Sequence, residues 1–406
     1  MRVDRVLMTA DTVGGVWTYA LDLARKLAGR GCEVTLATMG GYLPHAEARA
    51  VARVRNIHLY ESNFKLEWME DPWADVAQAG EWLLGIAHKT RPDIVHLNNY
   101  AHGSLPWPAP VLMAAHSCVL SWWQAVKGEH APASWDRYAA AVRRGLQAAN
   151  LVVAPTHAML DALAAHYGPL PQGRVIYNGR DGHCFSPAPK EPFVLAVGRL
   201  WDEAKNVQAL DRAAADMRWP VYVAGADQHP DGGQRLFAHL HPLGRLAPPE
   251  LAKWFGRAAI YALPARYEPF GLSVLEAALS GCALVLGDIR SLREVWGEAA
   301  LYVAPDDPHA LAQTINRLAA DPSLRVTMAQ KAQGRAQHYS EAAMAAEYWG
   351  AYQSLRAEAA EAAEATGAAE ITEAAQPASI YTRPAHLFRQ QAPAYTVYQP
   401  STQLGR

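Results

Sequence analysis

RVLMTADTVGGVWTYALDLARKLAGRGCEVTLAT, residues 5–38, contains one complete unit of an α/β fold. The apolar run Arg5–Ala10 predicts a buried strand, residues 16–31 follow a helical pattern, and Glu33–Thr38 predicts the next strand. A strand, a helix and a strand in this order form a unit whose two strands lie parallel in one sheet. The segment therefore predicts the fold class α/β with a parallel sheet.

The same alternation continues along the chain and restarts once. In the first part, short runs rich in Val, Ile and Leu predict further strands at Ile94–Asn98, Val111–Ala115, Leu151–Pro155 and Arg174–Tyr177. After an interruption by Pro187, Pro189 and Pro192, a second series follows at Phe193–Gly198, Val221–Ala224, Ile260–Ala262, Ala283–Gly287 and Leu301–Val303. Helical patterns separate most of these runs. We therefore expect two Rossmann-like domains, residues 1–186 and 187–339, joined by a stiff connector.

The C-terminal part departs from this alternation. From Ser340, an N-capping residue, an Ala- and Glu-rich helical pattern predicts a helix over residues 340–365. Residues 366–406 carry scattered Pro, Gln and Thr without sustained periodicity and are predicted to form a poorly ordered tail.

Composition argues against several classes of protein. The chain has 406 residues, half of them hydrophobic, and its 37 Lys and Arg against 39 Asp and Glu offer no basic platform for nucleic acid. The four cysteines are far apart and form no C-x-x-C pair, which is typical of reduced thiols in the cytoplasm. The apolar stretch at the N-terminus is too short for a signal sequence or a transmembrane segment. We expect a cytoplasmic protein and leave peripheral membrane contact open.

A diglycine follows the first predicted strand. Gly14 and Gly15 stand where the next helix begins, so backbone amides and the helix dipole there could bind an anion. The full G-x-G-x-x-G pattern is not present, and a plain tight turn is an equally good interpretation of these two residues alone.

Two cations follow the first strand of the second domain. Arg199 and Lys205 are close enough in sequence to converge beyond the carboxyl end of that strand, the usual ligand side of an open α/β sheet. Together they could stabilise a departing diphosphate, a task that a divalent metal performs in other enzymes. A solvated pair of surface side chains is the alternative. No cluster of His, Cys, Asp or Glu has the spacing of metal ligands, so no metal is expected.

The most specific segment is RYEPFGLSVLEA, residues 266–277. Its two carboxylates, Glu268 and Glu276, flank a Pro-Phe-Gly turn that precedes a helix starting near Leu272. Carboxylates accept hydrogen bonds from paired hydroxyls. The spacing therefore suits one contact to a ribose and one to a hexose, on either side of a diphosphate held by the helix N-terminus.

This segment resembles the Glu-x7-Glu motif of retaining GT-B glycosyltransferases, in particular the large family 4-like group. Further matching pieces occur in the same order, namely Gly14-Gly15, His116-Ser117, Tyr177-Asn178-Gly179, Gly198-Arg199-Leu200 with Lys205, and Gly281 with Ala283. The resemblance covers about residues 5–355. It implies two Rossmann-like domains that face each other across a deep cleft, with the C-terminal helix crossing back to the N-terminal domain. The first domain would bind the acceptor and the second the nucleotide sugar.

The sequence departs from the family pattern at two places, of which the first concerns the donor and the second the floor of the cleft. Ala224-Gly225-Ala226-Asp227 stands where the family commonly has a Gly-x-Gly-Pro-like turn, which puts the donor preference in doubt. Tyr177 stands where the family usually has a proline, although the Asn178-Gly179 turn is intact.

The resemblance also implies roles for individual residues. Glu276 would hold the ribose hydroxyls, Glu268 the region of the hexose 3-hydroxyl, and His116 the sugar's 6-hydroxyl. The diphosphate would be bound by Arg199, Lys205 and the amides of Gly14, Gly15, Phe270, Gly271 and Leu272. Arg245 and Leu246 would contact the edge of the base. Trp122 and Trp123, shortly after His116, are candidates for stacking on an acceptor sugar, with filling of the core as the alternative.

Together these features predict a retaining, metal-independent hexosyltransferase. The donor would be a nucleotide diphosphate sugar, with a UDP-sugar favoured and GDP-mannose left open, and no further cofactor is needed. The acceptor would be a glycan, a lipid-linked glycan or a small molecule, as in polysaccharide biosynthesis. The alternatives are a nucleotide-sugar epimerase or phosphorylase on the same scaffold, and a non-catalytic protein that binds nucleotide sugars. The segment with Glu268 and Glu276 argues against both.

Overall fold

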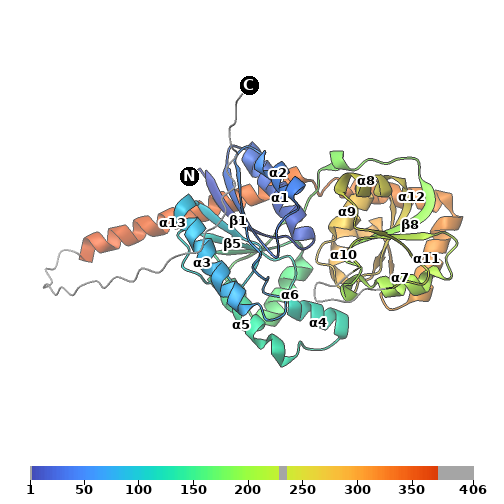
Figure 1. Cartoon of the computed structure of the whole chain (residues 1–406), viewed down its shortest axis with the longest axis horizontal. Helices are drawn as coiled ribbons and strands as arrows, with labels where there is room; N and C mark the ends of the chain where they lie inside the picture. Colours follow the sequence, from blue (N-terminus) through green and yellow to red (C-terminus); the bar gives the residue numbers. More distant parts are fainter. Residues whose placement is uncertain (1, 228–235, 374–406) are drawn as a thin grey trace, which may run out of the picture.

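The computed structural model describes residues 2–227 and 236–373, and it contains two lobes that lie side by side (Figure 1). Each lobe is built on one sheet in which every paired strand is parallel. This confirms the predicted α/β class with two Rossmann-like domains.

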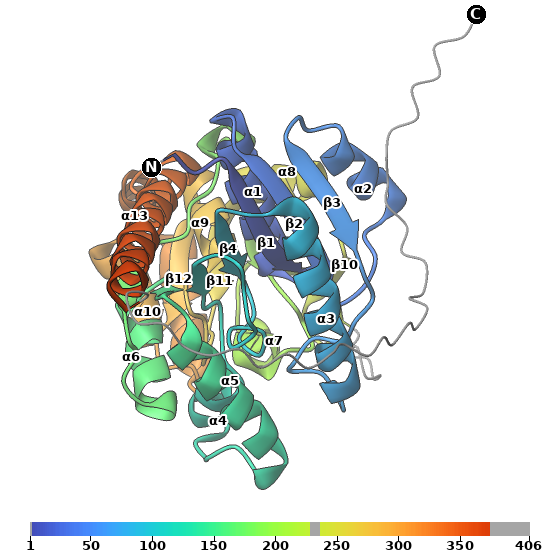
Figure 2. The ribbon, with the colours of Figure 1, turned by 90° about the vertical axis from the view of Figure 1, so that its left-hand side faces the viewer.

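The first lobe holds a seven-stranded sheet in the order β3-β2-β1-β4-β5-β6-β7 (Figure 2). Its strands are β1 (Arg5–Asp11), β2 (Glu33–Met39), β3 (Ile57–Glu61), β4 (Ile94–Leu97), β5 (Val111–Ala114), β6 (Leu151–Ala154) and β7 (Gly173–Val175). Its helices are α1 (Gly15–Gly29), α2 (His45–Ala52), α3 (Trp73–Thr90), α4 (Val119–Lys127), α5 (Asp136–Ala148) and α6 (His157–Tyr167). The central strands β4, β5 and β6 are buried along their whole length, as expected for a sheet covered on both faces.

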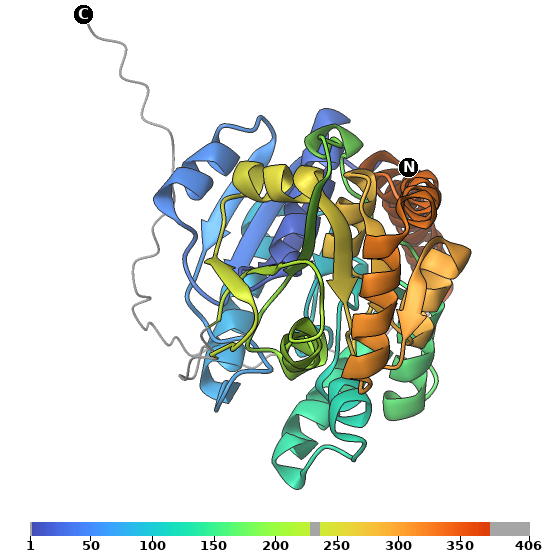
Figure 3. The same ribbon diagram turned by 90° about the vertical axis from the view of Figure 1, so that its right-hand side faces the viewer.

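The second lobe, which faces the viewer in Figure 3, holds a six-stranded sheet whose strand order is β10-β9-β8-β11-β12-β13. Its strands are β8 (Glu191–Val197), β9 (Val221–Ala224), β10 (His241–Gly244), β11 (Ala258–Leu263), β12 (Ala283–Gly287) and β13 (Leu301–Val303). Its helices are α7 (Val207–Ala214), α8 (Pro248–Arg257), α9 (Leu272–Leu279), α10 (Arg290–Trp296), α11 (Pro308–Ala320) and α12 (Pro322–Ala336). In both lobes the sheet order reverses after a central strand, and ligands of such sheets bind at the carboxyl ends of the strands near that reversal.

Two strands were not predicted from the sequence, β3 and β10. Both are edge strands, and both lack the continuous apolar run by which the other strands were found. The sequence HPLG of β10 even contains a proline, which is tolerated at a sheet edge because the missing N–H faces outward.

The last described helix, α13 (Glu341–Glu373), leaves the second lobe and packs on the first, as predicted (Figure 1). Tyr348 and Tyr352 are buried against α1 and β4, and the Tyr352 hydroxyl lies 2.5 Å from Nδ1 of His96. The helix continues past the predicted end at residue 365, because the sequence as far as Glu373 remains rich in Ala and Glu, which have high helix propensity. The rest of the predicted tail, residues 374–406, lies outside the described residues.

Within the described part of the chain, no helix is both long and apolar enough to cross a membrane.

Candidate functional site

Two helix N-termini meet where the lobes touch. Helix α1 begins after Gly14 and helix α9 after Gly271, and neither start has a side-chain cap among the described residues. A Cβ atom added to Gly15 would lie 3.4 Å from Cδ1 of Leu272, so the first residues of the two helices are in contact. Free backbone N–H groups and the positive ends of two helix dipoles therefore point into one region, which favours an anion.

Glycine is needed at both helix starts. Gly14 has φ +98° and Gly271 has φ +90°, a region of backbone conformation that residues with a side chain rarely adopt. At Gly271 a Cβ atom would in addition lie 2.9 Å from Cγ2 of Val274. Of the diglycine noted in the sequence, Gly14 is therefore required by this turn.

Arg199 reaches the same region from the loop after β8. A Cβ atom on Gly14 would lie 3.4 Å from Nη1 of Arg199, which places the guanidinium of the second lobe against the start of α1. The other end of the guanidinium is fixed, because Nη2 lies 2.8 Å from Oδ2 of Asp202. The side chain is 36% exposed, so the cation is held in place but still accessible.

Lys205 and Glu268 form an ion pair beside Arg199. The distance between Nζ of Lys205 and Oε2 of Glu268 is 2.6 Å, and both side chains are mostly buried. The loop that carries Glu268 is held from the other side, because the Ser291 hydroxyl donates to the Glu268 carbonyl at 2.5 Å. Lys205 therefore stands, with its charge already paired, at the turn before α9, residues 268–271, which we call the donor turn after the role that the resemblance implies.

Glu276 lies one turn inside α9 and is buried. Its Oε1 atom lies 2.9 Å from Nε of Arg180, and the same guanidinium forms a second ion pair with Asp22 of α1. Burial raises the pKa of the Glu276 carboxyl, and the charge of Arg180 opposes that shift. Sequence analysis missed Arg180 and Asp22, which are 158 residues apart in the chain.

His116 stands at the carboxyl end of β5, in the first lobe. Its Nε2 atom lies 2.7 Å from Oδ1 of Asn98, whose Nδ2 donates to the Thr9 carbonyl at 2.6 Å and so fixes the orientation of the amide. Burial lowers the pKa of His116 to about 4, so the ring is neutral at pH 7. The hydrogen-bond network therefore assigns the proton to Nε2 and leaves Nδ1 as an acceptor for a hydroxyl.

Further polar residues line the strand ends of the first lobe, and sequence analysis did not identify them. Asp11 ends β1, and its side chain is close enough to Arg199 and Trp68 to interact with both. Burial raises the pKa of Asp11 to about 7, although the Val13 amide and Arg199 oppose the shift. Glu67 is buried behind this edge and accepts hydrogen bonds from the amides of Tyr100 and Ala101 at 3.0 and 2.6 Å. A signal was available for Asp11, since it is the last residue of an apolar strand, at the carboxyl end where ligands of such sheets bind.

Two families match the chain, one for each lobe. Glycosyltransferase Family 4 matches residues 13–182, and Glycosyl transferases group 1 matches residues 191–321. The chain belongs to the family 4-like glycosyltransferases of the GT-B fold. This glycosyltransferase is thus an enzyme that uses a nucleotide sugar, and the membership favours the transferase over the epimerase, the phosphorylase and the non-catalytic binding protein.

Known glycosyltransferases resemble the chain along most of its length. D-inositol 3-phosphate glycosyltransferase of Nocardioides sp. is 26% identical over 407 residues, which cover 86% of this chain and 87% of that protein. Glycogen synthase of Mycobacterium tuberculosis is 26% identical over 370 residues, covering 80% of this chain and 86% of that protein. The similarity therefore includes both lobes and both halves of the site.

Solved structures confirm the GT-B fold of the glycosyltransferase. Sucrose-phosphate synthase from Thermosynechococcus elongatus superposes with a TM-score of 0.74 at 19% identity, covering 87% of this chain and all 100% of that one. HepE of Anabaena, in complex with UDP and glucose, superposes with a TM-score of 0.68 at 18% identity, covering 86% of this chain and 100% of that one.

Trp122 of the glycosyltransferase connects the two lobes. Its indole N–H donates to Oδ1 of Asp202 at 3.1 Å, and Asp202 is also the partner of Arg199. Trp123 stacks edge-to-face on Trp122 with ring centroids 5.8 Å apart. Both indoles are only partly buried, so neither is fully used in filling the core.

Arg245 and Leu246 directly follow the edge strand β10. Gly225, at the end of β9, donates to the Gly244 carbonyl at 2.9 Å, and a Cβ atom on Gly225 would collide with the Gly198 carbonyl at 1.7 Å. The strand ends that carry Arg199 and Arg245 are therefore packed side by side. Residues 228–235, between them in the chain, lie outside the described residues.

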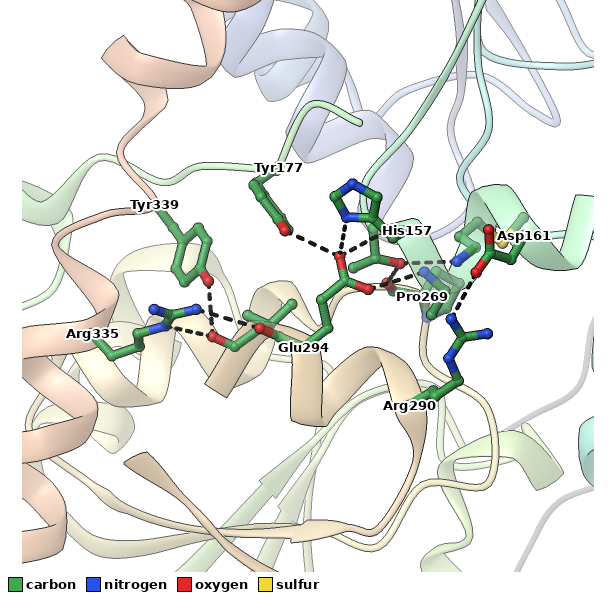
Figure 4. A network of polar contacts seen from close by, with 12 residues as sticks. His157, Asp161, Tyr177, Pro269, Arg290, Glu294, Arg335 and Tyr339 are labelled. Atoms are coloured by element: carbon green, nitrogen blue, oxygen red, sulfur yellow. Dashed lines mark hydrogen bonds and ion pairs between the residues drawn. The ribbon is translucent and has the colours of Figure 1, made fainter. Parts of the chain in front are cut away.

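A network around Glu294 holds the donor turn of the glycosyltransferase against the first lobe (Figure 4). The Glu294 carboxylate of α10 accepts hydrogen bonds from the amides of His157 and Ala158, at the start of α6, at 2.7 and 3.0 Å. The Tyr177 hydroxyl donates to the same carboxylate at 3.1 Å. The residue that stands in place of the usual proline therefore takes part in the contact between the lobes. The Thr156 hydroxyl also donates to the carbonyl of Pro269, inside the donor turn, at 3.0 Å.

The described residues contain no group of three or more His, Cys, Asp or Glu side chains that could hold a metal ion.

Proposed function

We propose that this enzyme transfers a hexose from a UDP-sugar to an acceptor hydroxyl with retention of configuration and without a metal ion. The contact between the N-termini of α1 and α9, with Arg199 against Gly14 and Lys205 at the donor turn, carries the proposal. Two cations and two sets of free amides at one place suit a diphosphate.

The other residues suit the rest of the donor. Glu276, inside α9, would accept hydrogen bonds from the ribose, and Glu268, at the donor turn, from the hexose. His116 has a neutral ring with a free acceptor and would bind a hydroxyl of the transferred sugar. Arg245 and Leu246 would flank the base, because they follow β10, which lies next to β9, and β9 in turn lies next to β8.

Uridine is the favoured base. HepE of Anabaena, which has the same fold, is known in complexes with UDP and with UDP-glucose. GDP-mannose is the second candidate, because the loop after β9 departs from the common family pattern.

The chemistry would depend on electrostatic stabilisation. The bond between the anomeric carbon and the diphosphate oxygen breaks, and the acceptor oxygen bonds to the same face of the sugar. The acceptor's proton passes to the departing phosphate oxygen. Arg199, Lys205 and the helix amides stabilise the negative charge that develops on the diphosphate, in place of a metal.

The acceptor is a compound with a free hydroxyl, such as a growing polysaccharide, a lipid-linked glycan or a small polyol. Carboxylate, amide and imidazole groups at the strand ends of the first lobe suit hydroxyls, and the partly exposed Trp122 and Trp123 suit the face of a sugar ring. A role in glycan or polysaccharide biosynthesis follows from this chemistry.

The test is a panel of UDP-, GDP- and ADP-sugars ranked by thermal shift, followed by assays with acceptors in which the released nucleotide is measured. We expect release of UDP, a product with the anomeric configuration of the donor by NMR, and activity within about twofold in EDTA. Tight donor binding without release of any nucleoside diphosphate, with or without acceptor, would indicate a binding protein. Conversion of the bound sugar to its epimer would indicate an epimerase.

A further inference from the structure

Arg180 stands at the crossing between the two lobes. Its amide donates to the Tyr339 carbonyl at 3.1 Å, and its carbonyl accepts from the Glu341 amide at 3.2 Å. The preceding Gly179 is packed so closely that a Cβ atom would lie 2.1 Å from the Ser340 carbonyl oxygen. The backbone of Arg180 is therefore held in place by residues 339–341, the other chain segment that passes between the lobes.

The guanidinium of Arg180 lies between one carboxylate of each lobe. It pairs with Asp22 of α1 in the first lobe and, at 2.9 Å, with Glu276 of α9 in the second. It also lies over the ring of Phe185, 5.2 Å from the centroid. Its side chain is only 13% exposed, so little solvent screens these charges.

The contact with Glu276 leaves that carboxylate able to bind a ligand. Although Oε1 lies 2.9 Å from Nε of Arg180, this nitrogen has no aligned hydrogen-bond partner among the described residues. The pair involves Oε1 of Glu276, and a carboxylate has acceptor sites on both oxygens, so Glu276 can still accept hydrogen bonds from a ribose.

We propose that Arg180 is the positioning residue for ribose recognition: its guanidinium holds the Glu276 carboxylate in place for the 2′- and 3′-hydroxyls of the donor. The inference rests on the proposed function, in which Glu276 binds the ribose. Arg180 itself does not touch the reacting atoms.

The charges around Glu276 agree with this role. Burial raises the pKa of both Glu276 and Asp22, and in each case the positive charge of Arg180 opposes the shift. Tyr261 of β11 also lies close enough for Glu276 to contribute to the raised pKa of its hydroxyl. Without Arg180, the titratable groups that face Glu276 from the described part of the chain would be Asp22 and the neutral Tyr261, and protonation of the Glu276 carboxyl would become more favourable. A protonated carboxyl loses the charge that strengthens its hydrogen bonds to hydroxyls.

A neighbouring ion pair provides a matched control. Lys26 of α1 pairs with Glu341 of α13, close to the same crossing and between the same chain segments. Lys26→Gln therefore removes a similar ion pair between α1 and the returning helix, and it leaves Glu276 untouched.

The experiment compares the binding of UDP and of 2′-deoxy-UDP by calorimetry, with the GDP and ADP pairs run alongside. The wild type and Lys26→Gln should prefer the ribonucleotide by roughly 10- to 100-fold in Kd, since a hydrogen bond to a charged group is lost in the deoxy form. In Arg180→Gln the preference should fall to within about threefold, and it should recover in part as the pH is raised from about 6 to about 8.5. Arg180→Lys, which keeps the charge, should retain most of the preference.

The outcomes separate this inference from the function on which it rests. A wild type that binds none of the nucleotides overturns the proposed function. A wild type with a clear preference that Arg180→Gln keeps unchanged at all pH values overturns only the role of Arg180. Should Arg180→Gln not fold, Asp22→Asn serves instead, because it leaves the guanidinium wholly to Glu276. The preference must then stay or increase at low pH, and a loss would overturn the inference.

Discussion

The two edges of the site are built in different ways. In the second lobe, two short segments, residues 198–206 and 266–277, supply both cations and both glutamates. In the first lobe, single residues such as Asp11, Asn98 and His116 come together only because β1, β4 and β5 are neighbours in the sheet. The proposed anion site is thus encoded in short motifs, whereas the proposed surface for hydroxyls depends on the whole fold.

The two edges also differ in charge. On the second-lobe side, Lys205 and Glu268 form a direct ion pair at 2.6 Å. On the first-lobe side, Asp11 and Glu67 are acids without a direct ion pair among the described residues, and burial raises the pKa of each to about 7. The first-lobe edge should therefore change its charge near neutral pH.

The largest expected effect tests the second-lobe edge. Lys205→Ala removes one of two fixed cations and leaves the Glu268 carboxylate without its partner beside the diphosphate. We expect kcat to fall by about 100- to 1,000-fold, the range found when one preorganised electrostatic group is removed. Steady-state kinetics with UDP-sugar and acceptor measure it.

Lys253→Ala, at an exposed position on α8, is the control for Lys205→Ala and should stay within about twofold of the wild type. If the Lys205 variant retained activity within a few-fold of the wild type, the cation would not act on the leaving group. The contrast between the two edges would then lose its functional meaning.

The same contrast explains how far the sequence alone could lead. Strands β9, β12 and β13 were predicted to the residue, because they are short apolar runs bounded by other patterns. Arg199, Lys205, Glu268 and Glu276 lie within short motifs, so a shared site for them could be predicted from local spacing and the resemblance.

Residues whose partners are distant in sequence could not be found in this way. Trp122 meets Asp202 across 80 residues, and Arg180 meets Asp22 across 158. No local sequence pattern predicts such a partner, because the pairing depends on the tertiary fold. The edge strands β3 and β10 were missed for a related reason, since half-exposed strands need no continuous apolar run.

The second prediction tests the first-lobe edge by pH. Because the pKa of Glu67 is about 7 in the folded state and 4.5 in an exposed chain, the folded state binds more protons between these two values. The free energy of unfolding should therefore fall as the pH rises from about 4.5 to about 7, by up to about 3 kcal/mol from this group. Urea unfolding at a series of pH values should show a flatter dependence for Glu67→Gln than for the wild type.

Glu33→Gln, at the exposed first residue of β2, serves as the control for this pH series. Its stability should follow the wild-type curve. A Glu67→Gln curve parallel to the wild type would show that Glu67 is already ionised at low pH. The Glu67 carboxylate of the first-lobe edge would then keep its charge across this pH range.

The third prediction concerns the place where the two edges touch. Gly14→Ala forces a side chain onto a residue with φ +98° and toward the Arg199 guanidinium. We expect the free energy of unfolding to drop by about 1–3 kcal/mol, the strain of a backbone region that is essentially restricted to glycine, and the Kd for UDP to rise several-fold as the start of α1 shifts. Gly85→Ala, on the exposed side of α3 with nothing near its Cβ, should instead stabilise the protein by about 0.5–1 kcal/mol. Equal effects of the two substitutions would mean that the turn at Gly14 is not strained by a side chain.

The smallest expected effect separates the two uses of Trp122. Trp122→Phe removes the indole N–H that reaches Asp202 but keeps an aromatic face, and Asp202 retains its contacts with Arg199 at 2.8 Å and the Ala204 amide at 3.0 Å. We therefore expect a loss of about 1 kcal/mol, or roughly fivefold in kcat/KM for the donor, with the acceptor KM nearly unchanged. Trp122→Ala removes the ring as well, so the acceptor KM should rise about fivefold further if the ring stacks on a sugar. If a folded Trp122→Ala variant kept the acceptor KM of the wild type, Trp122 would be a contact between the lobes alone, and acceptor recognition would depend on the polar strand ends of the first lobe.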